Sequence, residues 1–286
     1  MKYFGVLARF VIIPLLIFRV ILWLDKRQKR KLPEPLQNWN DNIVLAGHAA
    51  VAVTYTTIWD NYLVAKGIWS YDPKLVTGKT IGWVPIEEYT FFVLQSLMTG
   101  SWWQTLARRV RADDRPYTGS AAPRLAFTSG LGVLWLASAY SLYKYRDNYM
   151  GLILAWALPP IMLQSAFGGD ILWRHRKLVA AGIAPATAYL GLVDSVAIGH
   201  GTWRINPENT LKIDVIKNLP LEEFTFFLLT NTLLVFGMTL VQAKESENRL
   251  PGFLKEPYLK LKARLMKPQP TAEPVETPVI VQEAEA

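Results

Sequence analysis

Seven long apolar runs divide this chain of 286 residues, and they constrain its fold more than any other feature. Each run is close to the ~20 residues that an α-helix needs to cross ~30 Å of hydrocarbon. We therefore expect an all-α integral membrane protein with seven transmembrane helices rather than one soluble core. The expected multi-pass spans are residues 3–24, 43–64, 84–106, 125–143, 149–172, 178–199 and 219–241.

The first run contains two arginines, Arg9 and Arg19, and the basic stretch DKRQKRK follows it. A cleavable signal peptide has its basic residues before the apolar stretch and small residues at its cleavage site. This run lacks a small-residue cleavage site, and its basic stretch follows the apolar residues, so it is predicted to be a retained helix. We expect the two arginine side chains to extend towards opposite membrane interfaces.

The distribution of Lys and Arg predicts the orientation of this topology. The connections at 25–42, 107–124 and 173–177, together with the segment after residue 242, hold twenty of these residues, whereas the other side holds nine. The positive-inside rule places the richer side in the cytoplasm. The N-terminus is then expected outside and the C-terminus in the cytoplasm. Because this pattern accounts for the formal charge of +8, no nucleic-acid partner is expected.

One short sequence occurs twice in the chain. Residues 85–92 read PIEEYTFF and residues 220–227 read PLEEFTFF, so six of the eight positions are identical. Each copy places two adjacent carboxylates at the head of an apolar helix. A buried carboxylate pair is costly in hydrocarbon, which favours a functional role. Proline followed by acids is also the ordinary chemistry of a helix N-terminus, and a capping acid can serve both purposes.

The match between the two copies extends upstream. Residues 67–73 (GIWSYDP) pair with residues 201–207 (GTWRINP), and Asp60 pairs with Asp194. Each copy therefore belongs to a unit of three helices, and the helix between the units restores the orientation of the second. Such a parallel repeat is related by an axis along the membrane normal. Both EE pairs are then expected at the same, non-cytoplasmic face.

We therefore expect two parallel three-helix repeats joined by a linking helix. The first repeat covers residues 1–106, a linker that includes the fourth helix covers 107–148, and the second repeat covers 149–242. Residues 243–286 are expected to form a cytoplasmic tail that is basic at first, then Pro- and Glu-rich and disordered. The basic stretch at 255–267 is expected to rest on anionic membrane lipid.

Six carboxylates are predicted to lie near one depth of the bundle, namely Asp60, Glu87, Glu88, Asp194, Glu222 and Glu223. Helical spacing puts aromatic rings one turn beyond the paired acids and polar side chains one turn further, at Phe91, Phe92, Phe226, Phe227, Gln95 and Asn231. Three tryptophans are candidates for the wall of the same cavity, namely Trp59, Trp69 and Trp203. Interfacial packing of the tryptophans and ordinary hydrogen bonding between helices are the alternative interpretations.

The sequence does not indicate metal or nucleotide chemistry. The chain has no Cys and only three widely spaced His, so no metal site is predicted. The G-L-G at 130–132 lacks the strand context and the third glycine of a dinucleotide site, and no cofactor is expected. Gly169, in the sequence GGD, is expected to permit a close contact between helices.

Acids and aromatic rings inside a bilayer suit a hydrocarbon substrate. A carboxylic acid in an apolar environment stays protonated near neutral pH and can protonate an electron-rich alkene. Carboxylates and aromatic faces stabilise the resulting carbocation, and a second carboxylate can then remove a proton. The chemistry predicted from these residues is a redox-neutral isomerisation.

The motif P-x-E-E at 85–88 and 220–223, preceded in each copy by an Asp and by G-x-W-x-x-x-P, resembles that of lycopene cyclases of the heterodimeric type. Bacterial members of that family consist of two small three-helix subunits. Archaeal and fungal members are fused, and in fungi the fusion precedes a phytoene synthase domain. The resemblance covers about residues 1–242 and is to the fused form without a synthase domain.

This resemblance implies an enzyme that converts the ψ-ends of lycopene, a lipid-soluble carotenoid, to β-ionone rings. Protonation at C2 creates a cation at C1, the C5=C6 bond attacks it, and loss of the C6 proton completes the ring. The resemblance further implies that Glu87 and Glu222 are the essential acids and that Glu88 and Glu223 match a variable second acid. The resemblance implies no flavin. It also makes upstream carotenoid enzymes candidate partners. Val193 stands where the first copy has Trp59, so the two units need not be equivalent.

Other functions stay open on the sequence. A related enzyme could act on other carotenoid ends, as a C50 cyclase or a hydratase. A transporter or proton carrier is the rival from a different class, because carboxylates in a parallel repeat suit it. It predicts a gated water path, whereas a cyclase predicts a closed cavity lined by aromatic rings. A retinal photoreceptor needs a Schiff-base lysine in its last helix, and residues 219–241 contain none.

Overall fold

The computed structural model describes residues 1–110 and 117–266. Residues Met1–Arg249 form one compact unit, and a second unit begins at Leu250. The helices of the first unit are α1 (Tyr3–Leu7), α2 (Ile13–Arg27), α3 (Asp41–Ala65), α4 (Ile86–Ala107), α5 (Ala121–Lys144), α6 (Tyr149–Arg174), α7 (Arg176–Gly199), α8 (Leu221–Gln242) and α9 (Lys244–Asn248). The second unit contains α10 (Gly252–Leu265).

All seven apolar runs form helices whose ends lie within a few residues of the predicted ones. The first run is a continuous helix in which a π-helical turn, η1 (Ala8–Ile12), joins α1 to α2. Asparagine side chains cap two helices: Asn40 accepts hydrogen bonds from the first turn of α3, and Asn148 does so for α6. Gly67 and Gly201 follow α3 and α7 with φ near +67° and +66°, a conformation that glycine adopts without steric cost.

Five of these helices are long and apolar enough to cross a membrane, namely Tyr3–Arg27, Ala121–Lys144, Tyr149–Arg174, Arg176–Gly199 and Leu221–Gln242. The prediction of a mostly helical membrane protein is thereby confirmed. Helices α3 and α4 are also long enough to cross, with 25 and 22 residues. They are less apolar, and α4 buries several polar side chains, among them Gln95, Thr99 and Gln104, inside the protein.

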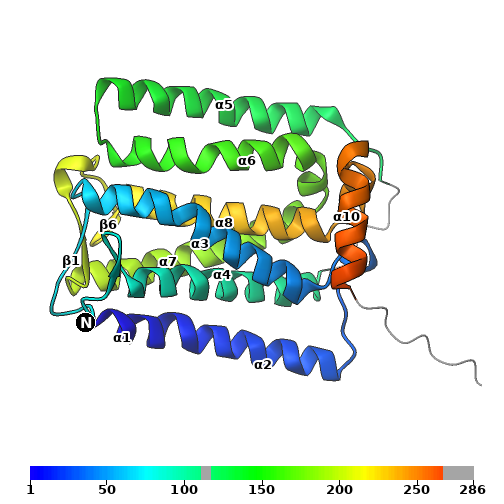
Figure 1. The fold of residues 1–286 in the computed structure, drawn as a ribbon, viewed down its shortest axis with the longest axis horizontal. Coiled ribbons are helices and arrows are strands. Elements are labelled where there is room, and N and C mark those ends of the chain that lie inside the picture. Colours follow the sequence, from blue (N-terminus) through cyan, green and yellow to red (C-terminus); the bar gives the residue numbers. More distant parts are fainter. Residues whose placement is uncertain (111–116, 267–286) are drawn as a thin grey trace, which may run out of the picture. The chain divides into compact units, whose positions relative to one another are not determined.

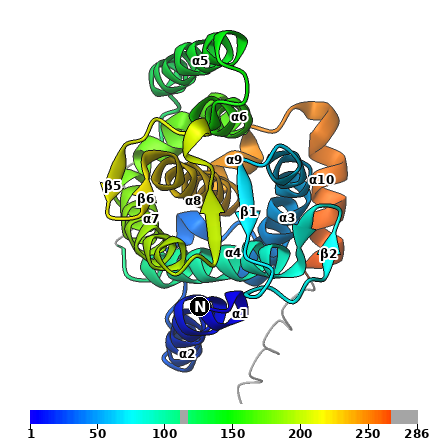
Figure 2. The ribbon, with the colours of Figure 1, turned by 90° about the vertical axis from the view of Figure 1, so that its left-hand side faces the viewer.

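The helices of the first unit run side by side, with the N-terminus and the strands gathered at one end (Figure 1). Seen along the helices, α3, α4, α7 and α8 form the centre, with α2 on one side and α6 on the opposite side (Figure 2). Helix α4 packs against α2, α3, α7 and α8, while α8 packs against α6 and α7. Helix α5 lies outside and packs on α6. The two EE-bearing helices, α4 and α8, are therefore adjacent at the core.

Short strands form three two-stranded antiparallel sheets at this end, and the sequence-based prediction of an all-α chain did not include them. The strands are β1 (Trp69–Tyr71), β2 (Thr80–Ile81), β3 (Val84–Pro85), β4 (Trp203–Ile205), β5 (Asp214–Ile216) and β6 (Leu219–Pro220). Strand β1 pairs with β4 so that Ser70 lies opposite Arg204. Strands of two or three residues leave no periodic pattern in a sequence, because periodicity needs at least four positions. The β1–β4 sheet joins the loop that precedes α4 to the loop that precedes α8.

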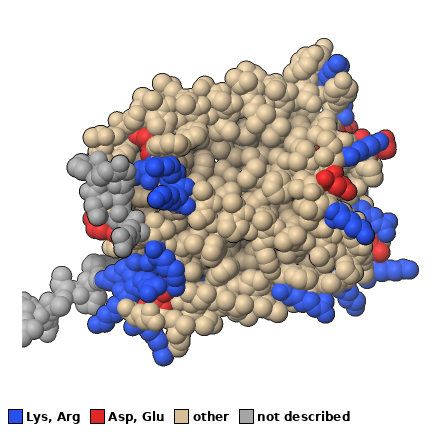
Figure 3. Space-filling model, turned by 180° about the vertical axis from the view of Figure 1, so that it is seen from behind, with Lys and Arg blue, Asp and Glu red and all other residues tan. Residues whose placement is uncertain are grey.

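The outer surface of the bundle carries large apolar side chains, as a surface facing lipid should. Ile13, Leu16 and Ile17 on α2 are each about half exposed, and Ile58 on α3 is 80% exposed. Figure 3 shows one face on which charged side chains gather at the two ends, with a broad band free of them between. Arg9 reaches Met1 at one end, whereas Arg19 reaches Asn42 at the start of α3. The two arginines therefore extend in opposite directions along the first helix, as predicted.

A buried ion pair fixes the end of the bundle that lies opposite the strands. Asp170 accepts hydrogen bonds from the Arg249 guanidinium at 2.6 and 2.8 Å and from the Tyr117 hydroxyl at 2.6 Å. Burial and the hydrogen bond to Asp170 raise the pKa of Tyr117 to about 12. The adjacent Gly169 lies so close to α5 that an added Cβ would stand 3.0 Å from the Cα of Arg124. The expected close helix contact at this glycine is confirmed.

The segment after residue 242 is helical over Lys244–Asn248 and over Gly252–Leu265. The basic stretch expected at 255–267 falls almost wholly within α10. The Pro- and Glu-rich part of the predicted tail, residues 267–286, lies outside the described residues.

Candidate active site

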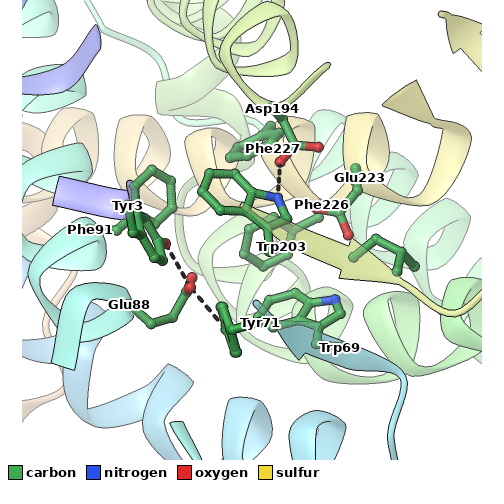
Figure 4. Close-up of a pocket in the computed structure, with 11 residues that line it drawn as sticks. Tyr3, Trp69, Tyr71, Glu88, Phe91, Asp194, Trp203, Glu223, Phe226 and Phe227 are labelled. Atoms are coloured by element: carbon green, nitrogen blue, oxygen red, sulfur yellow. Dashed lines mark hydrogen bonds between the residues drawn. The ribbon is translucent and has the colours of Figure 1, made fainter. Parts of the chain in front are cut away.

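A small pocket lies beneath the β1–β4 sheet, between the N-terminal turns of α4 and α8 (Figure 4). Among the described residues that line it, three carry carboxylates, Glu88, Asp194 and Glu223, and none carries a positive charge. Its volume is about 20 Å³, which is room for one water molecule. Acids from both copies of the repeated motif therefore meet in one small pocket.

Glu88, in the first turn of α4, is buried and accepts two hydrogen bonds from phenols. The hydroxyl of Tyr3, at the start of α1, donates at 2.6 Å, and the hydroxyl of Tyr71, on β1, donates at 2.9 Å (Figure 4). Burial and the nearby charge of Glu88 raise the pKa of Tyr71 well above its usual range, so this phenol acts as a donor. Two donors on one carboxylate favour its charged form.

Glu223, the corresponding acid of α8, has a different set of partners. The Tyr149 hydroxyl, at the start of α6, donates to it at 2.6 Å. Position 205 on β4, which corresponds to Tyr71, is an isoleucine that also lines the pocket. Glu223 thus accepts one phenolic hydrogen bond where Glu88 accepts two, which leaves its protonated form less disfavoured.

The two aspartates also differ. Asp194 on α7 lines the pocket, and one of its oxygens accepts from Trp203 Nε1 at 2.8 Å, while Oδ2 is buried without a partner among the described residues. Asp60 on α3 is fully buried beside the site, and both of its oxygens lack a partner in the described part of the chain. An unpaired buried carboxylate is strongly disfavoured in its charged form.

The first acid of each motif does not line the pocket. Glu87 accepts a 2.6 Å hydrogen bond from the backbone N–H of Thr77, and Glu222 accepts one of the same length from Leu211. Both donors lie in the loop that precedes the helix, at corresponding positions of the two copies. Each of these acids therefore fastens its loop to its helix, and its second oxygen is buried without a partner among the described residues.

Most of the predicted aromatic residues surround the acids. Trp69, Trp203, Phe91, Phe226 and Phe227 line the pocket. Phe92 and Trp59 do not line it but belong to the same buried cluster. Trp59 stacks on Phe226 at a centroid distance of 5.7 Å and meets Trp69 edge-on, also at 5.7 Å. These rings give the acids a wall rich in π-electrons.

The predicted polar pair lies deeper, two turns along the central helices. Gln95 Nε2 donates to Asn231 Oδ1 at 3.3 Å, and Thr99 donates to the same oxygen at 3.0 Å. Asn231 in turn donates to Thr187 on α7 at 3.3 Å. The pair is brought together as expected, but it joins α4, α7 and α8 to one another and does not line the pocket.

Sequence reasoning missed the three phenols that bind the pocket acids, Tyr3, Tyr71 and Tyr149. One signal was available: Tyr3 and Tyr149 begin the first helix of their respective three-helix units, so they occupy corresponding positions. A second corresponding contact supports this alignment. Tyr55 donates to the carbonyl of Trp156 at 2.8 Å, and Tyr189 donates to that of Phe10 at 2.9 Å.

No group of His, Cys, Asp and Glu side chains that could hold a metal ion is found among the described residues. The pocket offers acids, phenols and aromatic rings, which are groups able to transfer protons in an apolar environment.

Comparison with known proteins accords with this site. The family model described as lycopene cyclase matches residues 8–106 and 147–241. The chain belongs to the lycopene cyclase family. Both matched segments of this family include one copy of the EE motif, and the interval between them contains α5. No solved structure matches the chain.

Named members of the lycopene cyclase family align with most of this chain. A protein named lycopene beta-cyclase from Halobacterium salinarum is 39% identical over 191 residues, which cover 67% of this chain and 78% of that protein. A bifunctional lycopene cyclase/phytoene synthase from Podospora anserina is 36% identical over 198 residues, 66% of this chain and 33% of that protein. The corresponding protein of Phycomyces blakesleeanus is 35% identical over 193 residues, 65% of this chain and 32% of that protein.

Proposed function

We propose that this protein is a lycopene β-cyclase that closes the ψ-ends of lycopene to β-ionone rings without net oxidation or reduction. The observation that carries this proposal is the meeting of Glu88, Glu223 and Asp194 in one pocket walled by aromatic rings. The names of the relatives from Halobacterium and the fungi support the substrate. A hydrocarbon has no group for a polar site to bind, so proton transfer and cation stabilisation are what such a site can supply.

The unequal hydrogen bonding of the two glutamates assigns their roles. Glu223, with one phenolic donor, is the acid that adds a proton to C2 of the ψ-end and leaves a cation at C1. The C5=C6 electron pair then forms the C1–C6 bond and moves the cation to C5. Glu88, whose charged form the hydroxyls of Tyr3 and Tyr71 favour, removes the C6 proton, and those electrons form the C5=C6 bond of the ring. One proton enters and one leaves.

The neighbouring groups support these steps. The faces of Phe91, Phe226, Phe227 and Trp69 stabilise the passing cation. Asp194 lies in the same cavity and can pass a proton from Glu88 back to Glu223 after each cycle. Glu87 and Glu222, which the resemblance marks as essential, serve in this proposal by holding the loops that carry Tyr71 and its counterpart.

We further propose that all seven long helices cross the membrane. The polar residues that lower the hydropathy of α4 face inward and are buried, which suits a helix inside a bundle. Corresponding contacts of Tyr3 and Tyr149, and of Tyr55 and Tyr189, support two parallel three-helix repeats at 1–106 and 149–242, with 107–148 as linker. The surplus of Lys and Arg after residue 242 and in the loops on that side favours a cytoplasmic C-terminus and an N-terminus outside.

The fused fungal relatives suggest a working association. Their names join a lycopene cyclase to a phytoene synthase in one chain. We propose that the present protein works beside an upstream carotenoid enzyme in the same membrane. Co-purification from a membrane that contains both proteins would test this association.

Expression in a host that accumulates lycopene tests the function. Chromatography of the pigments should show cyclised product from the natural chain, and Glu88→Gln and Glu223→Gln should each reduce it at least a hundredfold. Glu208→Gln, at an exposed loop acid, is the matched control and should retain activity. Unchanged lycopene from well-expressed natural protein would overturn the proposal. A hydroxylated product would instead identify a hydratase.

A further inference from the structure

A groove opens on the outer surface of the bundle between α3 and α6. It has a volume of about 870 Å³ and is lined by Val51, Tyr55, Ile58, Trp59, Tyr62 and Trp156. Ile58 is 80% exposed and Val51 67% exposed, so both belong to the apolar outer surface of the helices. The groove runs along α3 from its middle, at Ala50, towards the end that carries the acids.

The inner wall of this groove packs against the wall of the acid pocket. Trp156 stacks on Trp59 at 4.5 Å with an interplanar angle of 14°, and Trp59 stacks on Phe226 at 5.7 Å with an angle of 6°. Phe226 lines the acid pocket, and Trp59 lines the groove. The stacked rings of Trp59 and Phe226 therefore lie between a large space open to the outside and a small pocket of about 20 Å³.

The hydroxyl groups of the groove are all engaged, and the unpartnered indole N–H groups of Trp59 and Trp156 are buried away from its surface. The Thr54 hydroxyl donates to Ala50 O at 2.9 Å, that of Tyr55 to Trp156 O at 2.8 Å, and that of Tyr62 to Asp147 at 3.0 Å. All three donors are engaged within the protein. A ligand that fits must therefore be a hydrocarbon, and stacked aromatic faces favour a flat, conjugated one.

The corresponding place in the other half of the bundle is filled. Val193 stands where the first half has Trp59, and it packs with Val6 and Ala197 against Phe10 between α7 and the first helix. The space left beside these residues is about 10 Å³. The two halves thus differ at the place where the first half has the groove, with Trp59 in one and Val193 in the other.

We propose that the α3–α6 groove binds the polyene chain of an acyclic carotenoid taken sideways from the membrane, and that the end of this chain reaches the acids when the stacked rings of Trp59 and Phe226 swing aside. This inference rests on the proposed cyclase function and gives it an access route. The pocket cannot hold an end group of ten carbons while Trp59 stacks on Phe226, because it has room for one water molecule. The Nε1 of Trp59 has no hydrogen-bond partner among the described residues, so no polar contact opposes this movement.

The test uses one substitution in the groove and its matched counterpart. Ile58→Trp fills the groove, whereas Leu192→Trp adds the same ring at the corresponding outer position of α7, which is 56% exposed. Both full-length variants are placed in phosphatidylcholine vesicles with lycopene. We expect Ile58→Trp to lower kcat/KM at least tenfold, mainly through KM, and Leu192→Trp to stay within twofold of the natural protein. Unchanged kinetics in Ile58→Trp would overturn the proposal.

Binding is measured separately from turnover in the Glu88→Gln background. Lycopene is achiral, so circular dichroism in its visible band reports a chiral binding site. This signal should be present in the background protein and in Leu192→Trp, and lost in Ile58→Trp. If Ile58→Trp unfolds at a lower temperature than Leu192→Trp, Val51→Trp takes its place at the exposed side of the groove.

Two further outcomes separate failure of the proposed function from failure of the access route. If the natural protein neither binds nor converts lycopene, the proposed function itself fails, whatever the variants do. If Ile58→Trp loses co-purifying phospholipid but keeps the lycopene signal and turnover, the groove holds a lipid acyl chain, and the access route is wrong.

Discussion

Glu88 and Glu223 face one pocket from the first turns of two adjacent helices, and they differ in how many phenols they bind. Tyr3 and Tyr71 donate to Glu88, whereas Tyr149 alone of the described phenols donates to Glu223. The difference arises at one pair of corresponding strand positions, Tyr71 on β1 and Ile205 on β4. A duplicated unit thus presents two chemically unequal acids, which is what a reaction with one proton donor and one proton acceptor needs.

Exchange of these strand residues should test the assignment of acid and base. Tyr71→Phe removes one donor from Glu88, and since a hydrogen bond to a charged group contributes ~1.5–3 kcal/mol, the rate should fall by roughly ten- to a hundredfold. Ile205→Tyr gives Glu223 a second donor and should also slow the reaction, because it favours the charged form of the acid. Tyr143→Phe, at an 86% exposed phenol of α5, is the control. Full activity in Tyr71→Phe would contradict the assignment of Glu88 as base.

Loss of the loop anchors should reduce stability as well as activity. Glu87→Ala and Glu222→Ala each leave a backbone N–H without its carboxylate, so the free energy of unfolding should fall by ~1–3 kcal/mol. Thermal unfolding in detergent measures the change, with the exposed Glu208→Ala as reference. A Glu87→Ala protein with unchanged stability and no activity would instead give this acid a direct part in the chemistry.

The ion pair of Asp170 and Arg249 should contribute more to stability than a surface pair. Asp170 Oδ1 and Arg249 Nη1 lie 2.6 Å apart, and the Asp170 side chain is only 4% exposed. Removal of one partner from a buried pair costs ~3–5 kcal/mol, so Asp170→Ala should lower the unfolding temperature clearly. The exposed pair of Lys212 and Glu208 should contribute less than ~1 kcal/mol. Double-mutant cycles on both pairs would measure this difference, and equal coupling energies would refute it.

Cysteine labelling should establish the topology, since the chain has no native Cys. Lys79→Cys lies in the exposed loop before α4, and Lys31→Cys lies in the exposed connection before α3. In intact cells, a membrane-impermeant maleimide should label residue 79 and should label residue 31 only after the membrane is opened. The reverse pattern would invert the proposed orientation, and labelling of both in intact cells would exclude seven crossings.

The seven long apolar runs predicted all seven long helices, because a run of about twenty apolar residues has few other stable forms. The repeated motif predicted that acids from two distant segments lie at one end of the bundle. The structure brings Glu88, Asp194 and Glu223 together there, and it buries the remaining three predicted acids nearby. Such predictions succeed because each apolar run and each copy of the motif consists of residues close together in the chain.

Only the fold decided which glutamate of each EE pair faces the pocket and which one binds its loop. Glu87 and Glu88 are adjacent in sequence and alike in chemistry, but successive residues of a helix point about 100° apart, so one meets its loop and the other the pocket. The phenols came from the chain's third residue, a strand and a distant helix, and no local pattern connects them to the acids. The sequence alone therefore determined the helices, their membrane character and the duplicated acids. The tertiary structure decided which acids face each other, because that depends on helix rotation and on contacts between residues far apart in the chain, such as Tyr3 and Glu88, which are 85 positions apart.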